Sequence, residues 1–261
     1  MFYPLAKGLI DPAPFEFEHV LRDIQTLNEW AVEGRMEVTA ISIHTYPHVK
    51  DRYRLLNSGS SMGDGYGPLI VAREPVTADE LRGKVIAVPG EMTTAFLTLS
   101  LYLGRGTFQH RVTMFDQIPA EVAAGRADAG LIIHEGQLTY SQLDLHSVVD
   151  LGVWWQETTG LPLPLGGNVV RRDLGEPTCR RISEILKASI QMALENRDQA
   201  VEYALQFGRN LDITLADKFI GMYVNAWTLD YGEKGRQAVT ELLRRGHDAG
   251  LCPDPGEIDF I

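Results

Sequence analysis

The stretch Gly130-Leu-Ile-Ile-His134-Glu135 decides the fold predicted for this chain. Its first four residues are too apolar for a surface loop, and a short run of this kind is typical of a buried parallel strand. His134 then lies at the carboxyl end of that strand. Ligands of open α/β sheets bind just beyond such ends, and a histidine there can move a proton near neutral pH. His134 is therefore either a candidate base or a histidine that only hydrogen-bonds its neighbours.

The residues on both sides of this stretch predict alternating strands and helices. A strand over 84–90, a helix over 93–103, a strand over 110–115 and a helix over 118–125 precede it, which is the spacing of right-handed βαβ units and a parallel sheet. Other segments add strands, a connector rich in proline and glycine, and a helical tail. We expect the strands at 15–21, 38–43, 69–72, 148–155 and 168–172, the connector at 161–167, and helices at 23–33, 46–55 and from 177 onward.

Composition narrows the class of function. The chain has 261 residues, 44% of them hydrophobic, and carries 24 Lys and Arg against 35 Asp and Glu, for a net charge of −11. Nucleic acid needs a basic surface, so it is an unfavourable partner, as is an anionic membrane. Cys179 and Cys252 are far apart, which favours free thiols in a reducing compartment. With no signal peptide or long apolar run, we expect a cytoplasmic protein without membrane insertion.

Two segments could hold an anion. Thr93, Thr94 and Ala95 begin the helix after the strand over 84–90, and a helix amino terminus offers free N–H donors and a partial positive charge. The loop over 57–68 contains four glycines and three serines but no nucleotide-binding motif, so it is either an anion cradle or a plain turn. Metal-binding and nucleophile motifs such as HExxH, paired CxxC and GxSxG are missing from the sequence, so we expect no metal and no cofactor.

Several longer segments match a known family. They are Ile41-Ser42, Tyr53–Ala72, Val88-Pro-Gly90 with Thr93-Thr-Ala95, Ala129–Glu135, Asp150-Leu-Gly152 with Trp154-Trp155, Thr159–Gly166, Tyr223-Val-Asn-Ala226, Leu229-Asp230 and Gly232-Glu233. Together they resemble the 1,4-dihydroxy-6-naphthoate synthases of the futalosine route to menaquinone. The related chorismate dehydratases fit the region around His134 and the Leu-Pro-Leu-Pro-Leu-Gly segment less well.

The resemblance implies an activity and a site. The expected substrate is a carboxylate, cyclic dehypoxanthine futalosine, and the expected products are 1,4-dihydroxy-6-naphthoate and dihydroxyacetone. His134 matches the family's proton acceptor, and the substrate contacts fall on Ala40, Ile41, Ser42, Thr94 and Ala95. Thr93 joins them as the first residue of the same helix start. One histidine is enough for a base-initiated cleavage, to which a positioned base contributes about 10²–10⁴-fold.

The resemblance also implies the α/β architecture of type II periplasmic binding proteins, with two lobes and a cleft between them. Residues 1–77 and 164–261 form the first expected lobe, and residues 78–163 form the second. Family members carry a strand and a Ser-Pro-Cys-Pro-Asn-Asp-Thr-like segment before the helix that matches residues 2–6 of this chain. We therefore expect residues 1–261 to be less stable than a longer version with that strand.

Two other functions fit the same fold. A chorismate dehydratase would use a different base and substrate in the same two lobes. A solute-binding protein would close on its ligand without chemistry, although that class normally carries an export signal. The sequence does not specify an oligomeric state.

Overall fold

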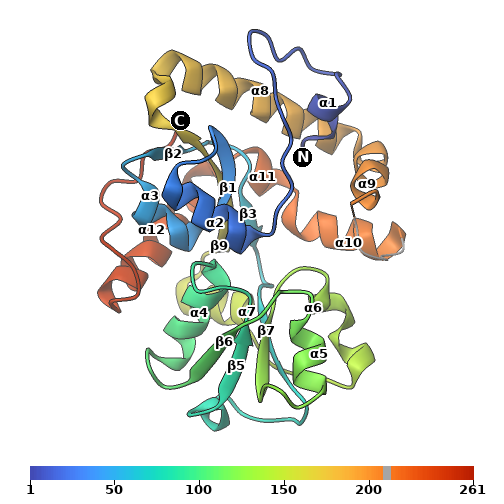
Figure 1. Cartoon of the computed structure of the whole chain (residues 1–261), viewed down its shortest axis with the longest axis vertical. Coiled ribbons are helices and arrows are strands. Elements are labelled where there is room, and N and C mark those ends of the chain that lie inside the picture. Colours follow the sequence, from blue (N-terminus) through green and yellow to red (C-terminus); the bar gives the residue numbers. More distant parts are fainter. Residues whose placement is uncertain (208–212) are drawn as a thin grey trace.

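The computed structural model describes residues 1–207 and 213–261, which form two lobes, each built on its own sheet (Figure 1). The first sheet has the order β1–β9–β2, with β3 also paired to β9. Its strands are β1 (Val38–Ser42), β2 (Tyr53–Leu55), β3 (Ser61–Gly63) and β9 (Leu163–Arg171). The second sheet has the order β6–β5–β7–β4–β8. Its strands are β4 (Leu69–Ala72), β5 (Val85–Val88), β6 (Gln109–Val112), β7 (Ala129–Ile132) and β8 (His146–Asp150).

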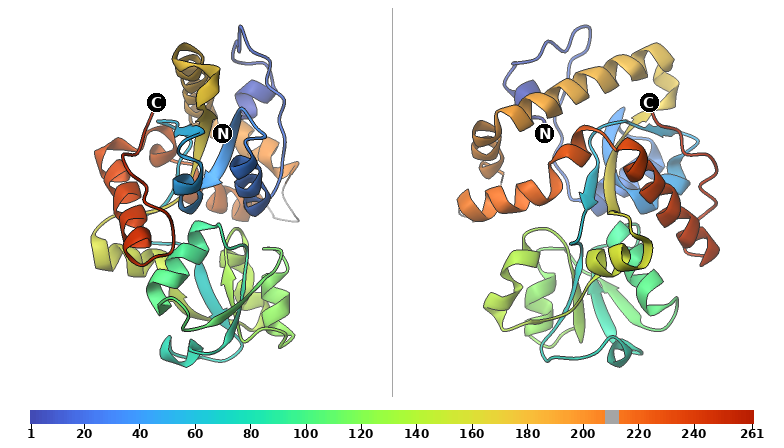
Figure 2. Two further views of the ribbon diagram at one scale, coloured as in Figure 1. Left: turned by 60° about the vertical axis from the view of Figure 1, so that its left-hand side comes forward. Right: turned by 180° about the vertical axis from the view of Figure 1, so that it is seen from behind.

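Helices surround both sheets, as the three views in Figures 1 and 2 show. Those of the first lobe are α1 (Tyr3–Ala6), α2 (Ile24–Glu33), α3 (Tyr46–Val49), α8 (Glu176–Glu195), α9 (Arg197–Leu205), α10 (Ile213–Tyr223), α11 (Ala226–Leu229) and α12 (Gly232–Asp248). Those of the second lobe are α4 (Thr94–Leu103), α5 (Ile118–Ala123), α6 (Gly136–Thr139) and α7 (Leu151–Thr159). Short 3₁₀ helices cover Ile43–Thr45, Asp79–Leu81, Tyr140–Leu143 and Arg172–Leu174.

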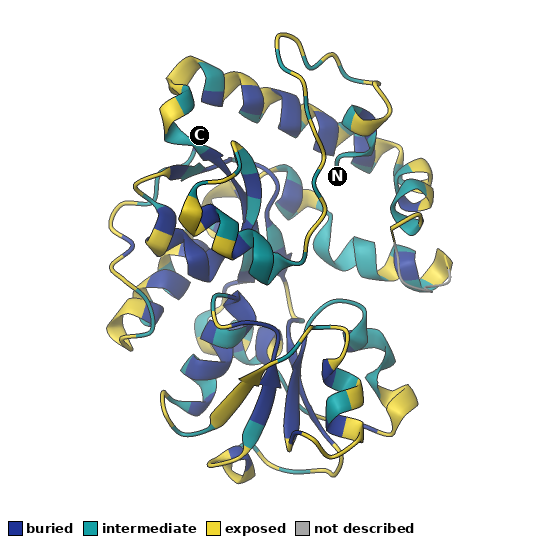
Figure 3. Ribbon diagram, viewed as in Figure 1, coloured by how far each residue is buried: buried dark blue, intermediate teal, exposed yellow. Residues whose placement is uncertain are grey.

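The parallel unit predicted around His134 is confirmed within a mixed sheet. β5 pairs in parallel with both β6 and β7, whereas β4 pairs antiparallel with β7 and β8. All residues of β7 are buried, as expected for a strand covered on both faces (Figure 3). Alternate side chains enter two cores: Ile70 packs on the face that α4 covers, and Val71 on the face that α5 covers.

The sheet pairing corrects the expected lobe boundary. Residues up to 77 were expected in the first lobe, but Leu69–Ala72 forms β4 of the second sheet. The chain therefore crosses between the sheets over residues 64–68. An apolar run shows that a strand is buried but not which sheet it joins, because the pairing depends on distant residues.

One predicted strand is absent and another is confirmed only in its first part, each for a local reason. Residues 15–21 have no strand partner, and their alternation arises because Phe15 and Phe17 pack against a cluster that includes Leu56 and Val170. Residues 148–155 divide at Asp150, whose carboxylate accepts the N–H groups of the next turn and so begins α7.

Two other segments hold more strand than predicted. Residues 163–167 of the predicted connector are the first half of β9, and Pro164 is tolerated there because it faces an irregular pairing with β3. The predicted helix over 46–55 ends after Val49, and β2 follows it.

Candidate active site

His134 follows the carboxyl end of β7. Its backbone has a conformation that residues other than glycine rarely adopt. Its φ is 61°, in the left-handed region, which is uncommon for residues other than glycine and marks candidate functional positions. Because β5, β6 and β7 run in parallel, their carboxyl ends share one edge of the second sheet. That edge carries the start of α4, Phe115 and His134.

Aromatic rings from both lobes surround the imidazole of His134. The ring of Phe115, which follows β6, lies 4.5 Å away between centroids, and the ring of Phe219 on α10 lies 6.3 Å away. Within residues 1–207 and 213–261, no protein group hydrogen-bonds either ring nitrogen. The residue is still partly exposed. An accessible imidazole without a protein partner is free to accept a proton from a bound molecule.

The surroundings also set the protonation state of His134. Burial is the largest influence and lowers the pKa of the imidazole below its usual 6.5, while the charges of Glu135 and Asp23 raise it and offset part of the effect. Asp23 belongs to the first lobe, where its side chain caps α2. The lowered pKa keeps the imidazole neutral at pH 7, which is the form that acts as a base.

Ser42 lies at the boundary between the lobes and is held by a buried amide. Asn28 on α2 accepts the backbone N–H of Ser42 at 2.8 Å and donates to its hydroxyl at 3.0 Å. The same amide nitrogen lies 3.4 Å from the carbonyl of Met92, in the loop before α4. Asn28 thus connects the end of β1 with the second lobe. Sequence reasoning missed it, although a polar residue on the buried face of an amphipathic helix was a visible signal.

The other two substrate-binding residues expected on β1 have side chains that are less accessible to a ligand. Ile41 is fully buried in the core of the first lobe, and Ala40 is half-buried. Both are paired with β9 through the antiparallel ladder. Any contact of Ile41 with a ligand would therefore involve its backbone, because its side chain fills the core.

The hydroxyls of Thr93 and Thr94 already have protein partners. Thr93 caps α4 by accepting the N–H of Phe96 at 3.2 Å and donates to the carbonyl of Gly90 at 2.7 Å. The hydroxyl of Thr94 donates to the carbonyl of Leu165 on β9 at 2.6 Å. What this helix start offers a ligand is backbone instead, because in the described chain nothing accepts the N–H of Thr94 or Ala95.

The serine- and glycine-rich loop is mainly part of the protein core. It contains β3, and Ser58 and Ser60 are both fully buried. The hydroxyl of Ser60 donates to the carbonyl of Trp227 at 2.5 Å, while that of Ser58 has no partner among the described residues. Of the two readings left open by the sequence, this packing favours a structural turn.

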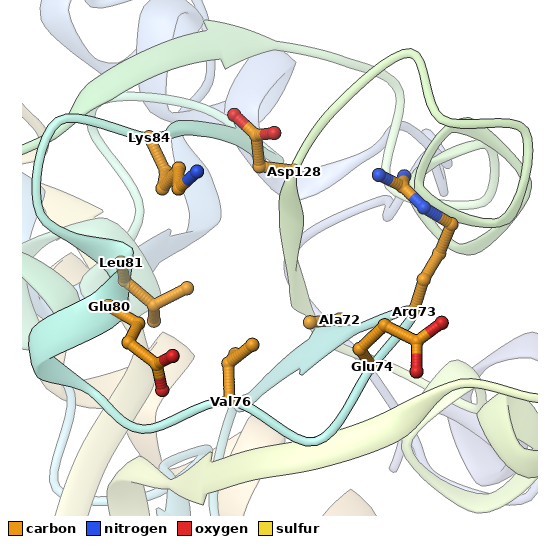
Figure 4. A pocket seen from close by; sticks show the side chains of 8 residues that line it. All are labelled: Ala72, Arg73, Glu74, Val76, Glu80, Leu81, Lys84 and Asp128. Atoms are coloured by element: carbon orange, nitrogen blue, oxygen red, sulfur yellow. The ribbon is translucent and has the colours of Figure 1, made fainter.

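One pocket lies far from these residues, at the opposite edge of the second sheet. Its lining joins the end of β4 to the starts of β5 and β7 (Figure 4). The lining residues are Ala72, Arg73, Glu74, Val76, Glu80, Leu81, Lys84 and Asp128. Two of its polar side chains hydrogen-bond the backbone of the second lobe. Asp128 accepts the N–H of Val85, and Arg73 donates to the carbonyl of Val122.

Two other features, a metal-binding cluster and a membrane-spanning helix, are absent from the described ranges. Among residues 1–207 and 213–261 there is no cluster of His, Cys, Asp and Glu able to hold a metal ion. No helix in this part of the chain has the length and apolar character needed to cross a membrane.

Comparison with known protein sequences shows the family of this chain. A family model described as menaquinone biosynthesis matches residues 1–248. A 1,4-dihydroxy-6-naphthoate synthase of Thermus thermophilus is 44% identical, with 98% of this chain and 92% of that protein aligned. One from Streptomyces coelicolor is 38% identical, with 98% and 91% aligned.

Comparison with solved structures shows which proteins share the fold of this chain. Protein AF1704 from Archaeoglobus fulgidus superimposes with a TM-score of 0.91 at 44% identity, covering 96% of this chain and 92% of its own. The alkanesulfonate-binding protein SsuA from Xanthomonas axonopodis pv. citri gives a TM-score of 0.64 at 12% identity, with 90% and 83% covered. At that identity the likeness shows the fold alone, and it confirms the two-lobed binding-protein architecture.

Proposed function

Because this chain belongs to the menaquinone-biosynthesis family and to its 1,4-dihydroxy-6-naphthoate synthases, which are lyases, we propose that His134 is the general base of the reaction. One observation carries the proposal. His134 stands at the carboxyl edge of the second sheet with an unusual backbone, and its ring nitrogens have no hydrogen-bond partner in the described residues.

The proposed substrate is cyclic dehypoxanthine futalosine. Its carboxylate would bind at the start of α4, where no acceptor within residues 1–207 and 213–261 pairs with the backbone N–H groups of Thr94 and Ala95. The partial positive charge of the helix end favours an anion there, so a protein with net charge −11 needs no basic patch. Ser42 would add a contact from the first lobe, in the orientation that Asn28 gives it. Ala40 and Ile41 would contribute backbone.

The chemistry then depends on proton transfer to His134. In its neutral form the imidazole accepts a proton from the bound substrate, which starts the carbon–carbon cleavage. Dihydroxyacetone leaves, and the ring system that remains becomes aromatic as 1,4-dihydroxy-6-naphthoate. The rings of Phe115 and Phe219 lie beside the imidazole and reduce its contact with water, which favours its neutral form and would protect the carbanion that proton removal creates.

The remaining proposals concern the cellular compartment, the partners and the closure of the two lobes. We place the protein in the cytoplasm, a proposal supported by the unpaired state of Cys179 and Cys252, since free thiols persist in reducing compartments. The acidic surface disfavours nucleic acid as a partner. Approach of the two lobes would complete the site around the substrate, as in other enzymes that close before reaction.

The test is turnover of cyclic dehypoxanthine futalosine by the wild-type protein and by His134→Ala, followed by the appearance of the naphthoate. We expect loss of about 10²–10⁴-fold in kcat. His146→Ala is the matched control, because His146 is exposed and pairs with Ala72 at the opposite edge of the sheet. Full activity of His134→Ala would exclude His134 as the base. Ligand binding without turnover by the wild type would contradict the proposed reaction, as would turnover of chorismate instead.

A further inference from the structure

A hydrogen bond joins the two lobes beside His134. The hydroxyl of Tyr223, the last residue of α10, donates to the side-chain carbonyl of Gln137 on α6 at 2.5 Å. The two elements belong to different lobes, and Figure 1 shows α10 directly above α6. Tyr223 opens the Tyr-Val-Asn-Ala segment to which the sequence assigned no role. Its hydroxyl lies at the lobe boundary.

Tyr223 is fixed on the side of the first lobe. Its ring packs edge-on against Phe219, with centroids 5.1 Å apart, and against Tyr66, 5.7 Å away. Tyr66 belongs to the segment that crosses between the sheets, and its hydroxyl donates to the carbonyl of Met222. After Tyr223, Asn225 caps the next helix. The position of the phenol therefore follows both the end of α10 and the crossing segment.

Gln137 is connected directly to the backbone of His134. Its N–H donates to the carbonyl of His134 at 3.1 Å, which closes the turn in which His134 takes its left-handed conformation. Gln137 itself is buried. Among the described residues, the Tyr223 hydroxyl is the only hydrogen-bond partner of the Gln137 side chain. Movement of Gln137 therefore acts on the turn that aims the imidazole.

We propose that the hydrogen bond between Tyr223 and Gln137 is an interlobe latch that aims the imidazole of His134, which makes both residues positioning residues for the reaction. This inference rests on the proposed role of His134 as base. Burial raises the pKa of the Tyr223 phenol, so the hydroxyl keeps its proton and can donate it to the Gln137 side-chain carbonyl. When the lobes meet, the bond forms, and the His134 turn is fixed against the first lobe.

The latch predicts a loss of rate with little change in binding. Tyr223→Phe removes the hydroxyl and keeps the ring, and Gln137→Met removes the acceptor at similar length. Each should lower kcat about 2- to 10-fold, the range expected for one hydrogen bond, and change KM less than twofold. The double variant should be no slower than the slower single variant, because both changes break the same bond.

Tyr3→Phe is the matched control. The hydroxyl of Tyr3 also donates to a glutamine, Gln199, at 2.6 Å, but this bond lies within the first lobe and is exposed. Its loss should leave kcat and KM unchanged. A second readout is independent of turnover: the proton NMR signal of the His134 imidazole, assigned by its disappearance in His134→Ala. It should shift in Tyr223→Phe and not in Tyr3→Phe.

Three results would overturn the latch. They are an unchanged kcat in Tyr223→Phe, a rise of KM alone, and losses that multiply in the double variant. An unchanged imidazole signal in Tyr223→Phe would also contradict it. Failure of the base assignment is a separate result, because it is decided by the activity of His134→Ala, whereas the imidazole signal reports the latch whatever His134 does.

Discussion

Replacing His134 by glycine and by alanine separates its chemistry from its backbone conformation. Its φ of 61° strains any residue with a side chain, by about 1–2 kcal/mol in the left-handed region. Both variants lose the same ring contacts with Phe115 and Phe219. Alanine keeps the strain and glycine relieves it, while the extra freedom of glycine in the unfolded chain offsets a part. We expect the glycine variant to be about 1 kcal/mol more stable than the alanine variant.

This difference is measurable by calorimetry or urea titration. For a chain of this size, 1 kcal/mol corresponds to about 2 °C in Tm. Both variants should be equally slow, about 10²–10⁴-fold below wild type in kcat, because neither has an imidazole. Equal loss of rate at unequal stability would show that the rate follows the missing base and not partial unfolding.

Two outcomes contradict this reasoning. An alanine variant as stable as the glycine variant would mean that the His134 backbone stores no strain. Wild-type kcat in either variant would mean that another group accepts the proton. A further check is the addition of imidazole, which should raise the rate of the glycine variant by entering the space between the two phenyl rings and should not affect the wild type.

Three more predictions concern the same boundary. Burial lowers the pKa of His134, so kcat should be constant near pH 7 and fall on acidification only below the usual 6.5, as a pH profile will show; an acid limb above 6.5 would refute it. Asn28→Ala leaves the buried N–H of Ser42 without an acceptor and should cost about 1–3 kcal/mol in a urea titration, whereas a loss below 0.5 kcal/mol would mean that water replaces the amide. Thr93→Ala should lose about 1 kcal/mol with the cap of α4, and Thr93→Ser should lose little, so equal thermal melts for the two would count against the cap.

The local pattern was enough for the element that carries His134. The apolar run over 130–133 predicted a buried strand, which the structure has as Ala129–Ile132, and the helices predicted over 93–103 and 23–33 begin at caps on Thr93 and Asp23. These features depend on neighbours a few residues away. The pairing of Leu69–Ala72 with the second sheet and the strand over residues 163–167 depend on partners far along the chain, and no local rule predicts them.

In the candidate site, too, some features follow from the local sequence and others do not. The position of His134 at a strand end followed from periodicity, and its catalytic role came from the resemblance. Phe219 and Tyr223 could not be placed beside it, because an aromatic residue on an amphipathic helix is normally core. Their place at the lobe boundary follows from where α10 lies, which the sequence does not encode locally.

The central position of β9 governs the order in which the chain can fold during synthesis. Among the described residues, β1, β2 and β3 each pair with β9 and not with one another, so the first sheet has no hydrogen-bonded ladder until β9 has left the ribosome. The strands of the second sheet all lie between residues 69 and 150, a continuous stretch that can fold before then. The nascent chain can therefore build the sheet that carries His134 first, and the other sheet can be completed only when β9 arrives.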